Sequence, residues 1–181
     1  MKYLFALLII LPLTSCFEHS PDPVIVNPPT SVSTFIPKEN AIVIILTKKG
    51  KVYLILGDTT HKDAILSNLN TNMSLSLNNL EIAKLKKMDS IGLPLNKLKT
   101  FLDLTNPELS SQMEGIPTKD STNNELIEWI KAVTQAYKGE DINKLNLILK
   151  GDRLAEYPEF KNIKAAFMKN NIYKFKIVTS N

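Results

Sequence analysis

The sequence predicts an α+β fold in which a small mixed β-sheet is packed by helices. The first observation is a pair of short apolar runs at residues 41–46 and 52–56, separated by a Lys-Lys-Gly turn, which is typical of a β-hairpin. The second is a helix-strand-helix-strand order in residues 122–178. This order forms a crossover unit, so we expect its two strands to be parallel and the connection to be right-handed.

The first helix of the crossover unit is predicted to begin with a capping box formed by Thr122 and Glu125. Apolar side chains then recur at helical spacing, at Leu126, Ile130, Val133 and Tyr137. Gly139 supplies a left-handed stop. The apolar run at residues 145–149 is too short for a helix and predicts a strand.

Gly151 and Asp152 follow this strand, and we interpret them as a structural turn. An aspartate at the carboxyl end of a parallel strand is also a common active-site position, but no partner residue accompanies it in the sequence. Pro158 predicts the first turn of the second helix.

The last apolar run, residues 173–178, predicts a strand with one face in water, because Tyr173, Phe175 and Ile177 alternate with lysines. If this strand lies at the edge of the sheet, its unpaired amides and carbonyls can pair with another chain. We therefore single out Tyr173 and Phe175 as partner-binding residues. Because the lysines blunt such pairing, we expect only a weak dimer.

Residues 61–114 predict a block of short helices between the hairpin and the crossover unit. Two further capping pairs begin helices in or beside this block, Thr60 with Asp63 and Asn78 with Glu81. Asn106 is expected to begin the last helix of the block, which stops near Gly115.

Residues 1–15 have the features of a lipoprotein-type signal peptide, which is removed from the mature chain. They end in Leu-Thr-Ser before Cys16, which resembles a bacterial lipobox, so Cys16 is the predicted lipidation site. The alternative is a membrane-spanning anchor. A helix over residues 3–15 would reach only about 20 Å at ~1.5 Å per residue, whereas the hydrocarbon core is about 30 Å thick.

Residues 16–39 are rich in proline, which favours an extended periplasmic linker. Within it, Val24 and Val26 alternate with other residues ahead of Pro29, a pattern that suits the addition of a strand to an exposed sheet edge. We therefore treat Val24, Val26 and Pro29 as a hypothetical partner-binding segment. The alternative is that the whole linker is a plain tether.

The folded part, residues 40–181, resembles the periplasmic domain of the ExbD/TolR family of biopolymer transporters, in its longer Bacteroidetes-type variant. The resemblance lies in the order and spacing of five short motifs: residues 89–94, 115–117, 120–126, 150–152 and 157–158. Relative to shorter members of that family, residues 61–114 are a helical insertion. The motif that follows the membrane helix in the family ends in Leu-Pro, whereas this chain has Pro28-Pro29.

The resemblance implies a non-enzymatic role in energy-coupled, TonB-type transport, with self-association and contact with TonB- or ExbB-like membrane components. In the family, an acidic residue within the membrane helix carries protons, and residues 3–15 contain neither Asp nor Glu. We therefore expect an accessory protein of the cell envelope, anchored to a membrane by lipid, with its domain in the periplasm. The alternative is a lipid-anchored module that binds peptidoglycan.

Other chemistry is not indicated by the sequence. The net charge of +4 is small and the lysines are scattered among acids, which argues against a nucleic-acid groove. His19 and His61 are interpreted as solvated polar residues, and no His, Cys and carboxylate cluster has metal-site spacing. Without a catalytic or nucleotide-binding motif, we expect neither enzymatic activity nor a cofactor.

Overall fold

The computed structural model describes residues 40–103, 113–119, 123–140, 142–152 and 157–180. The chain divides into two units, Met1–Ser31 and Val32–Asn181, and all the described residues belong to the second. The predicted signal peptide, the linker and the helix expected from Asn106 lie outside the described residues.

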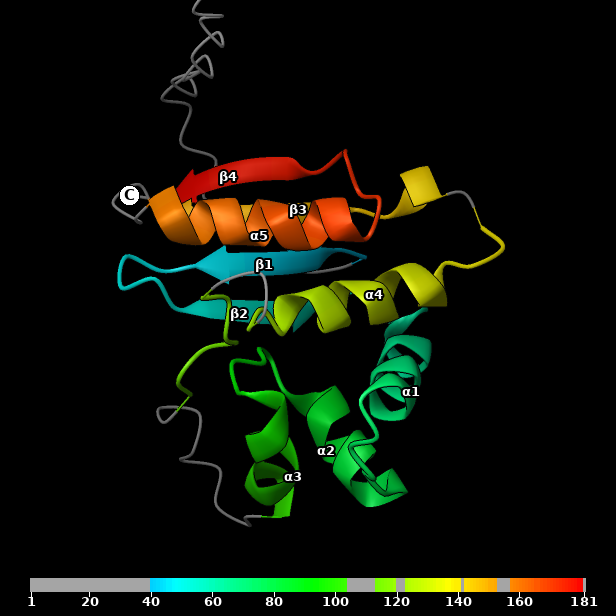
Figure 1. Ribbon diagram of the computed structural model, residues 1–181. Coiled ribbons are helices and arrows are strands. Elements are labelled where there is room, and N and C mark those ends of the chain that lie inside the picture. Colours follow the sequence, from blue (N-terminus) through cyan, green and yellow to red (C-terminus); the bar gives the residue numbers. More distant parts are fainter. Residues whose placement is uncertain (1–39, 104–112, 120–122, 141, 153–156, 181) are drawn as a thin grey trace, which may run out of the picture. The chain divides into compact units, whose positions relative to one another are not determined.

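The sheet has four strands in the order β2-β1-β3-β4. The strands are β1 (Ile42–Leu46), β2 (Val52–Leu56), β3 (Leu147–Asp152) and β4 (Lys176–Ser180). β1 and β2 form the predicted antiparallel hairpin, whereas β1 pairs with β3, and β3 with β4, in parallel. The predicted α+β class, the mixed sheet and the parallel crossover strands are therefore confirmed (Figure 1).

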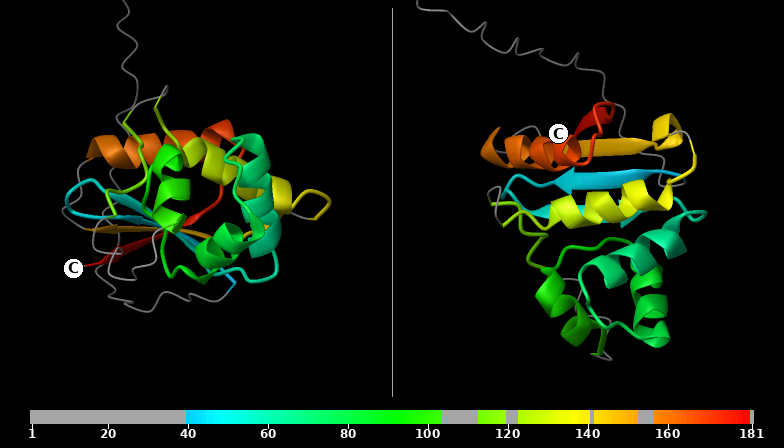
Figure 2. Two further views of the ribbon diagram at one scale, coloured as in Figure 1. Left: turned by 90° about the horizontal axis from the view of Figure 1, so that it is seen from below. Right: turned by 45° about the vertical axis from the view of Figure 1, so that its right-hand side comes forward.

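The helices are α1 (Lys62–Asn72), α2 (Asn79–Lys87), α3 (Leu95–Asp103), α4 (Leu126–Ala136), the 3-10 helix η2 (Ile142–Lys144) and α5 (Tyr157–Lys169). Helices α4 and α5 lie across one face of the sheet, whereas α1, α2 and α3 form a group beyond its β2 edge (Figures 1 and 2). α4 precedes β3, and α5 connects β3 to β4, as expected. Over the described part of the chain, no helix is both long and apolar enough to cross a membrane.

The core lies between the sheet and the helices. Alternate residues of β1, Ile42, Ile44 and Leu46, join the large apolar cluster that also contains Trp129 of α4 and Phe167 of α5. The residues between them point to the other face, where Val43 packs with Ala41 and Ile148 in a smaller cluster. Since both faces of β1 are buried, its continuous β-branched sequence is explained.

Two of the predicted helix starts can be compared directly. At α2 the capping box is present as predicted, because the Asn78 side chain accepts from the Glu81 amide at 2.9 Å and the Glu81 carboxylate from the Asn78 amide at 2.6 Å. At α1 the prediction is wrong, since neither Thr60 nor Asp63 caps the helix. The Asp58 carboxylate instead accepts from the amides of Thr60 and His61, at 3.0 and 3.3 Å.

The start of α4 also differs from the prediction, because Glu125 does not form the expected capping box. Its carboxylate forms no cap on its own helix; its Oε2 accepts from the amide of Leu95, the first residue of α3, at 2.7 Å. Burial raises the pKa of Glu125 above its usual value, and the bond from Leu95 opposes this shift. The carboxylate therefore caps a helix 30 residues earlier in the chain, and Thr122 lies outside the described residues.

The ends of the two crossover strands also differ from the prediction. Gly151 and Asp152, expected in a turn, are the last two residues of β3 and pair with Thr179 and Ser180. Gly151 does not have the positive φ that would require a turn, so it extends the strand without strain. At the opposite end of this strand pair, β4 begins at Lys176 rather than at Tyr173, and its parallel pairing with β3 starts at Ile148.

Candidate functional site

Among the residues that the structure describes, the outer edge of β4 is the open edge of the sheet. The opposite edge strand, β2, is covered: the amide and carbonyl of Leu54 bond to Ile91 at 2.8 and 2.7 Å, and the carbonyl of Val52 accepts from Ile116 at 2.8 Å. In the described segments nothing pairs with the outer edge of β4. Such an edge presents backbone groups that can add a strand from another chain.

Two large apolar side chains are exposed beside this edge. Tyr173 is 71% exposed and Ile177 is 54% exposed. Phe175, which we expected to contact a partner, is half-buried and its ring packs edge-on against Phe167, with ring centroids 4.8 Å apart. The structure therefore places Tyr173 at the surface, and assigns Ile177 rather than Phe175 to the exposed position on the strand.

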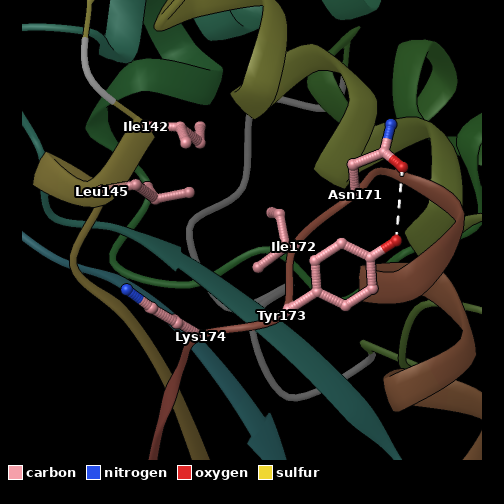
Figure 3. Close-up of a pocket in the computed structure, with 6 residues that line it drawn as sticks. All are labelled: Ile142, Leu145, Asn171, Ile172, Tyr173 and Lys174. Carbon is pink, nitrogen blue, oxygen red and sulfur yellow. Dashed lines mark hydrogen bonds between the residues drawn. The ribbon is translucent and has the colours of Figure 1, made fainter.

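A hollow of about 200 Å³ lies next to Tyr173. Ile142 and Leu145 come from η2 and the residues that follow it, and their side chains point across the hollow toward Ile172 (Figure 3). The segment between α5 and β4 supplies the rest of the lining, Asn171, Ile172, Tyr173 and Lys174. The hollow is thus built from two segments that precede the parallel strands β3 and β4.

One lysine lines this apolar hollow, and two others lie close to its lining residues in the sequence. Lys144 lies between the two apolar residues of the η2 side, and Lys174 and Lys176 lie along the approach to β4; all three are exposed. An extended segment that pairs with β4 could place one aliphatic side chain in the hollow and acidic side chains beside the lysines. We call β4, Tyr173 and the hollow together the docking edge.

Away from the docking edge, a cluster of polar side chains joins the start of α1 to the end of α4. The His61 ring stacks on the ring of Tyr137, with centroids 4.0 Å apart, and its Nδ1 lies 2.7 Å from Asp58 Oδ2. Its Nε2 lies 3.1 Å from Glu140 Oε1, and the Tyr137 hydroxyl donates to the same Asp58 oxygen. Our interpretation of His61 as a solvated residue is wrong, since only 14% of its side chain is exposed.

Contacts within this cluster shift the pKa values of His61, Asp58 and Tyr137. The hydrogen bond to Glu140 raises the pKa of His61 above 6.5, burial opposes that shift, and Asp58 adds to it. For Asp58, burial acts to raise the pKa, but the hydrogen bonds from Tyr137 and His61 outweigh it and the pKa lies below 3.8. Burial and the Asp58 carboxylate raise the pKa of Tyr137. The two carboxylates therefore stabilise the charged imidazolium form of His61 relative to the neutral ring.

A second hollow, of about 350 Å³, lies at the start of α4. Its walls carry charges of both signs: Glu125 and Glu128 from α4, and Lys169 from α5. Asn124 is buried there; its Nδ2 donates to the Asn162 carbonyl at 2.9 Å, and its Oδ1 has no hydrogen-bond partner. Its amide joins α4 to α5, which is a structural role.

Metal-ligating side chains do not converge in the described part of the chain, where no group of three or more His, Cys, Asp or Glu residues is placed to hold an ion. His61 illustrates why. Its two carboxylate neighbours contact opposite nitrogens of the ring, so the three groups face away from any common point.

The other residues named from the sequence can be placed only in part. Cys16, Val24, Val26 and Pro29 lie outside the described residues. Sequence reasoning missed three apolar residues that line the hollow, Ile142, Leu145 and Ile172. The only signal in the sequence was that Ile142 is an isolated apolar residue in a polar loop.

Comparisons with known proteins identify no relative: the chain matches no protein-family model, no curated protein and no solved structure.

Proposed function

We propose that this chain is a non-enzymatic, lipid-anchored envelope protein whose ExbD/TolR-like domain takes part in energy-coupled, TonB-type transport through its docking edge. The support for the family is the ordered set of sequence motifs in residues 40–181. The observation that carries the docking role is the open strand β4 beside an apolar hollow. Because residues 3–15 lack an acidic residue, the protein would act as an accessory rather than as the proton carrier.

The proposed partners are a second copy of the chain and a TonB- or ExbB-like membrane component. Site-specific crosslinking in cells, from a photoreactive residue at position 173, tests this role. We expect crosslinks to this chain and to membrane motor components. The alternative role, a peptidoglycan-binding module, predicts instead that the protein co-sediments with purified peptidoglycan and that position 173 forms no protein crosslinks.

Self-association should depend on Ile177. An aspartate there would be desolvated in any strand pairing at β4, so Ile177→Asp should raise the dimer dissociation constant by at least about tenfold. Sedimentation equilibrium at high protein concentration measures it. Leu80→Asp is the matched control, because Leu80 is 67% exposed but lies on α2. A wild-type protein that stays strictly monomeric, or equal effects of the two variants, would contradict the role of β4.

A separate prediction concerns the proposed lipid anchor at Cys16. Cys16→Ala should abolish incorporation of labelled fatty acid and leave an unprocessed precursor, because acylation of this cysteine is what attaches the mature chain stably to a membrane. Metabolic labelling and mass spectrometry of the intact protein measure both effects. A wild-type mature chain that still begins at Met1 would exclude the lipoprotein interpretation.

A further inference from the structure

The two ring nitrogens of His61 face two different carboxylates. Nδ1 is 2.7 Å from Asp58 Oδ2, and Nε2 is 3.1 Å from Glu140 Oε1. A carboxylate can only accept hydrogen bonds, and a neutral imidazole has a single N–H group to donate. Both contacts can therefore be hydrogen bonds only while the ring is protonated, and loss of the proton must break one of them.

The two carboxylates are held very differently. Only 7% of the Asp58 side chain is exposed, and it also accepts from the Tyr137 hydroxyl and from the amides of Thr60 and His61. The Glu140 side chain is 47% exposed, so water can replace the histidine as its partner at little cost. When the ring loses its proton, the remaining N–H stays on Asp58, and the lone pair on Nε2 repels Glu140.

Glu140 lies at the point where the chain leaves α4 for the docking edge. Its amide donates to the carbonyl of Tyr137 at 3.0 Å, just past the end of α4. Two residues later the chain enters η2 at Ile142, which lines the hollow beside Tyr173. The contact from His61 to Glu140 therefore ties the start of this connection to the start of α1.

We propose that His61 is a proton-operated latch that holds Glu140, and through it the Ile142 side of the docking hollow, in place. The latch is closed when the ring is charged and opens when the ring is neutral. Among the described residues, Asp58, Glu140 and the hydroxyl of Tyr137 are the titratable groups that face the ring; they come from the turn before α1 and from the segment just past α4. A regulatory role of His61 at the docking edge rests on the proposed function of that edge.

The direction of the response follows from the surroundings of the ring. Hydrogen bonding to Glu140 holds the pKa of His61 above 6.5, so the latch is closed below that pH and opens as the pH rises through the elevated pKa. A docking edge regulated in this way would have a fixed hollow at pH values below the pKa of His61 and an adaptable one above it.

Solution NMR of the full chain, titrated from pH 5.5 to 9, tests the latch. The His61 ring signals, identified by their absence in His61→Asn, should titrate with a midpoint above 6.5. The amide signals of Glu140, Ile142 and Leu145 should shift with the same midpoint. In Glu140→Gln the side-chain amide can donate to the neutral ring or accept from the charged one, so the midpoint should fall and the Ile142 signal should no longer follow it.

Glu114→Gln is the control, because it removes an exposed carboxylate that pairs with Lys97 and should leave the titration of His61 unchanged. A His61 midpoint at or below 6.5, or a normal titration to which Ile142 and Leu145 do not respond, would overturn the latch. The measurement needs no partner. The result of the NMR titration is therefore independent of the crosslinking experiment that tests the docking role.

Discussion

Asp58→Ala should lower the free energy of unfolding by about 3 kcal/mol, because it removes the acceptor at the centre of a buried hydrogen-bond cluster. The carboxylate accepts from two backbone amides, from His61 and from the hydroxyl of Tyr137. Without it, the Tyr137 hydroxyl is left buried without its acceptor, and the amides of Thr60 and His61, just before α1, lose theirs. Chemical denaturation at pH 7 measures the loss.

Asp63→Ala is the matched control. Asp63 lies five residues further on and is 67% exposed, and its ion pair with Lys86, at 2.6 Å, lies at the surface. Such pairs contribute little, so the control should cost no more than about 1 kcal/mol. Similar losses in both variants, or a loss below about 1 kcal/mol for Asp58→Ala, would show that the cluster does not stabilise the fold.

The stability difference between the wild type and Asp58→Ala should depend on pH, because the pKa of Asp58 is lowered in the folded state. A carboxyl group whose pKa is lower in the folded state binds fewer protons there than in the unfolded chain near pH 4. Its contribution is therefore full above the ordinary value of 3.8 and is lost as the pH falls through the folded pKa. The stability gap between the wild type and Asp58→Ala should shrink below pH 3.8. Because Asp58 also raises the pKa of His61 above 6.5, the gap should be full between these two values and narrow again as the pH rises through the pKa of His61.

Local patterns in the sequence predicted those parts of the fold that depend on neighbouring residues. The capping box at Asn78 needs only a partner three residues away. The spacing of Leu126, Ile130 and Val133 predicted the buried face of α4, and the order of the elements predicted the parallel pairing of β3 and β4. In these cases propensity, periodicity and chain connectivity suffice.

The parts that sequence reasoning missed depend on partners far away in the chain. Glu125 has the right spacing for a local capping box, yet its carboxylate bonds to Leu95, 30 residues earlier. Asp58 meets Tyr137 across 79 residues. The hollow at the docking edge likewise joins Ile142 to Tyr173. No spacing rule brings such pairs together, because they meet only after the helices have packed on the sheet.

Gly92→Ala should destabilise the protein by about 2 kcal/mol, because the added methyl group has no room. A Cβ atom at Gly92 would lie 2.2 Å from Cδ1 and 2.5 Å from Cε1 of Tyr53. The ring cannot move freely, since the Tyr53 hydroxyl donates to the carbonyl of Met113 at 3.2 Å. The backbone at Gly92 is also held in place, because the Gly92 carbonyl accepts a hydrogen bond from the Gly115 amide at 2.8 Å and the preceding Ile91 is hydrogen-bonded to β2.

Gly151→Ala is the matched control for this substitution, because nothing lies within 4 Å of a Cβ atom built at Gly151. Alanine within a strand should be neutral there or stabilise by up to about 1 kcal/mol. Thermal and chemical unfolding of both variants measure the contrast, and equal costs would contradict the steric explanation. Gly92→Ala should also cost much less in a Tyr53→Ala background, where the clashing ring is gone. A penalty that persists in that background would place its cause in the backbone of Gly92 instead of the close approach of Tyr53.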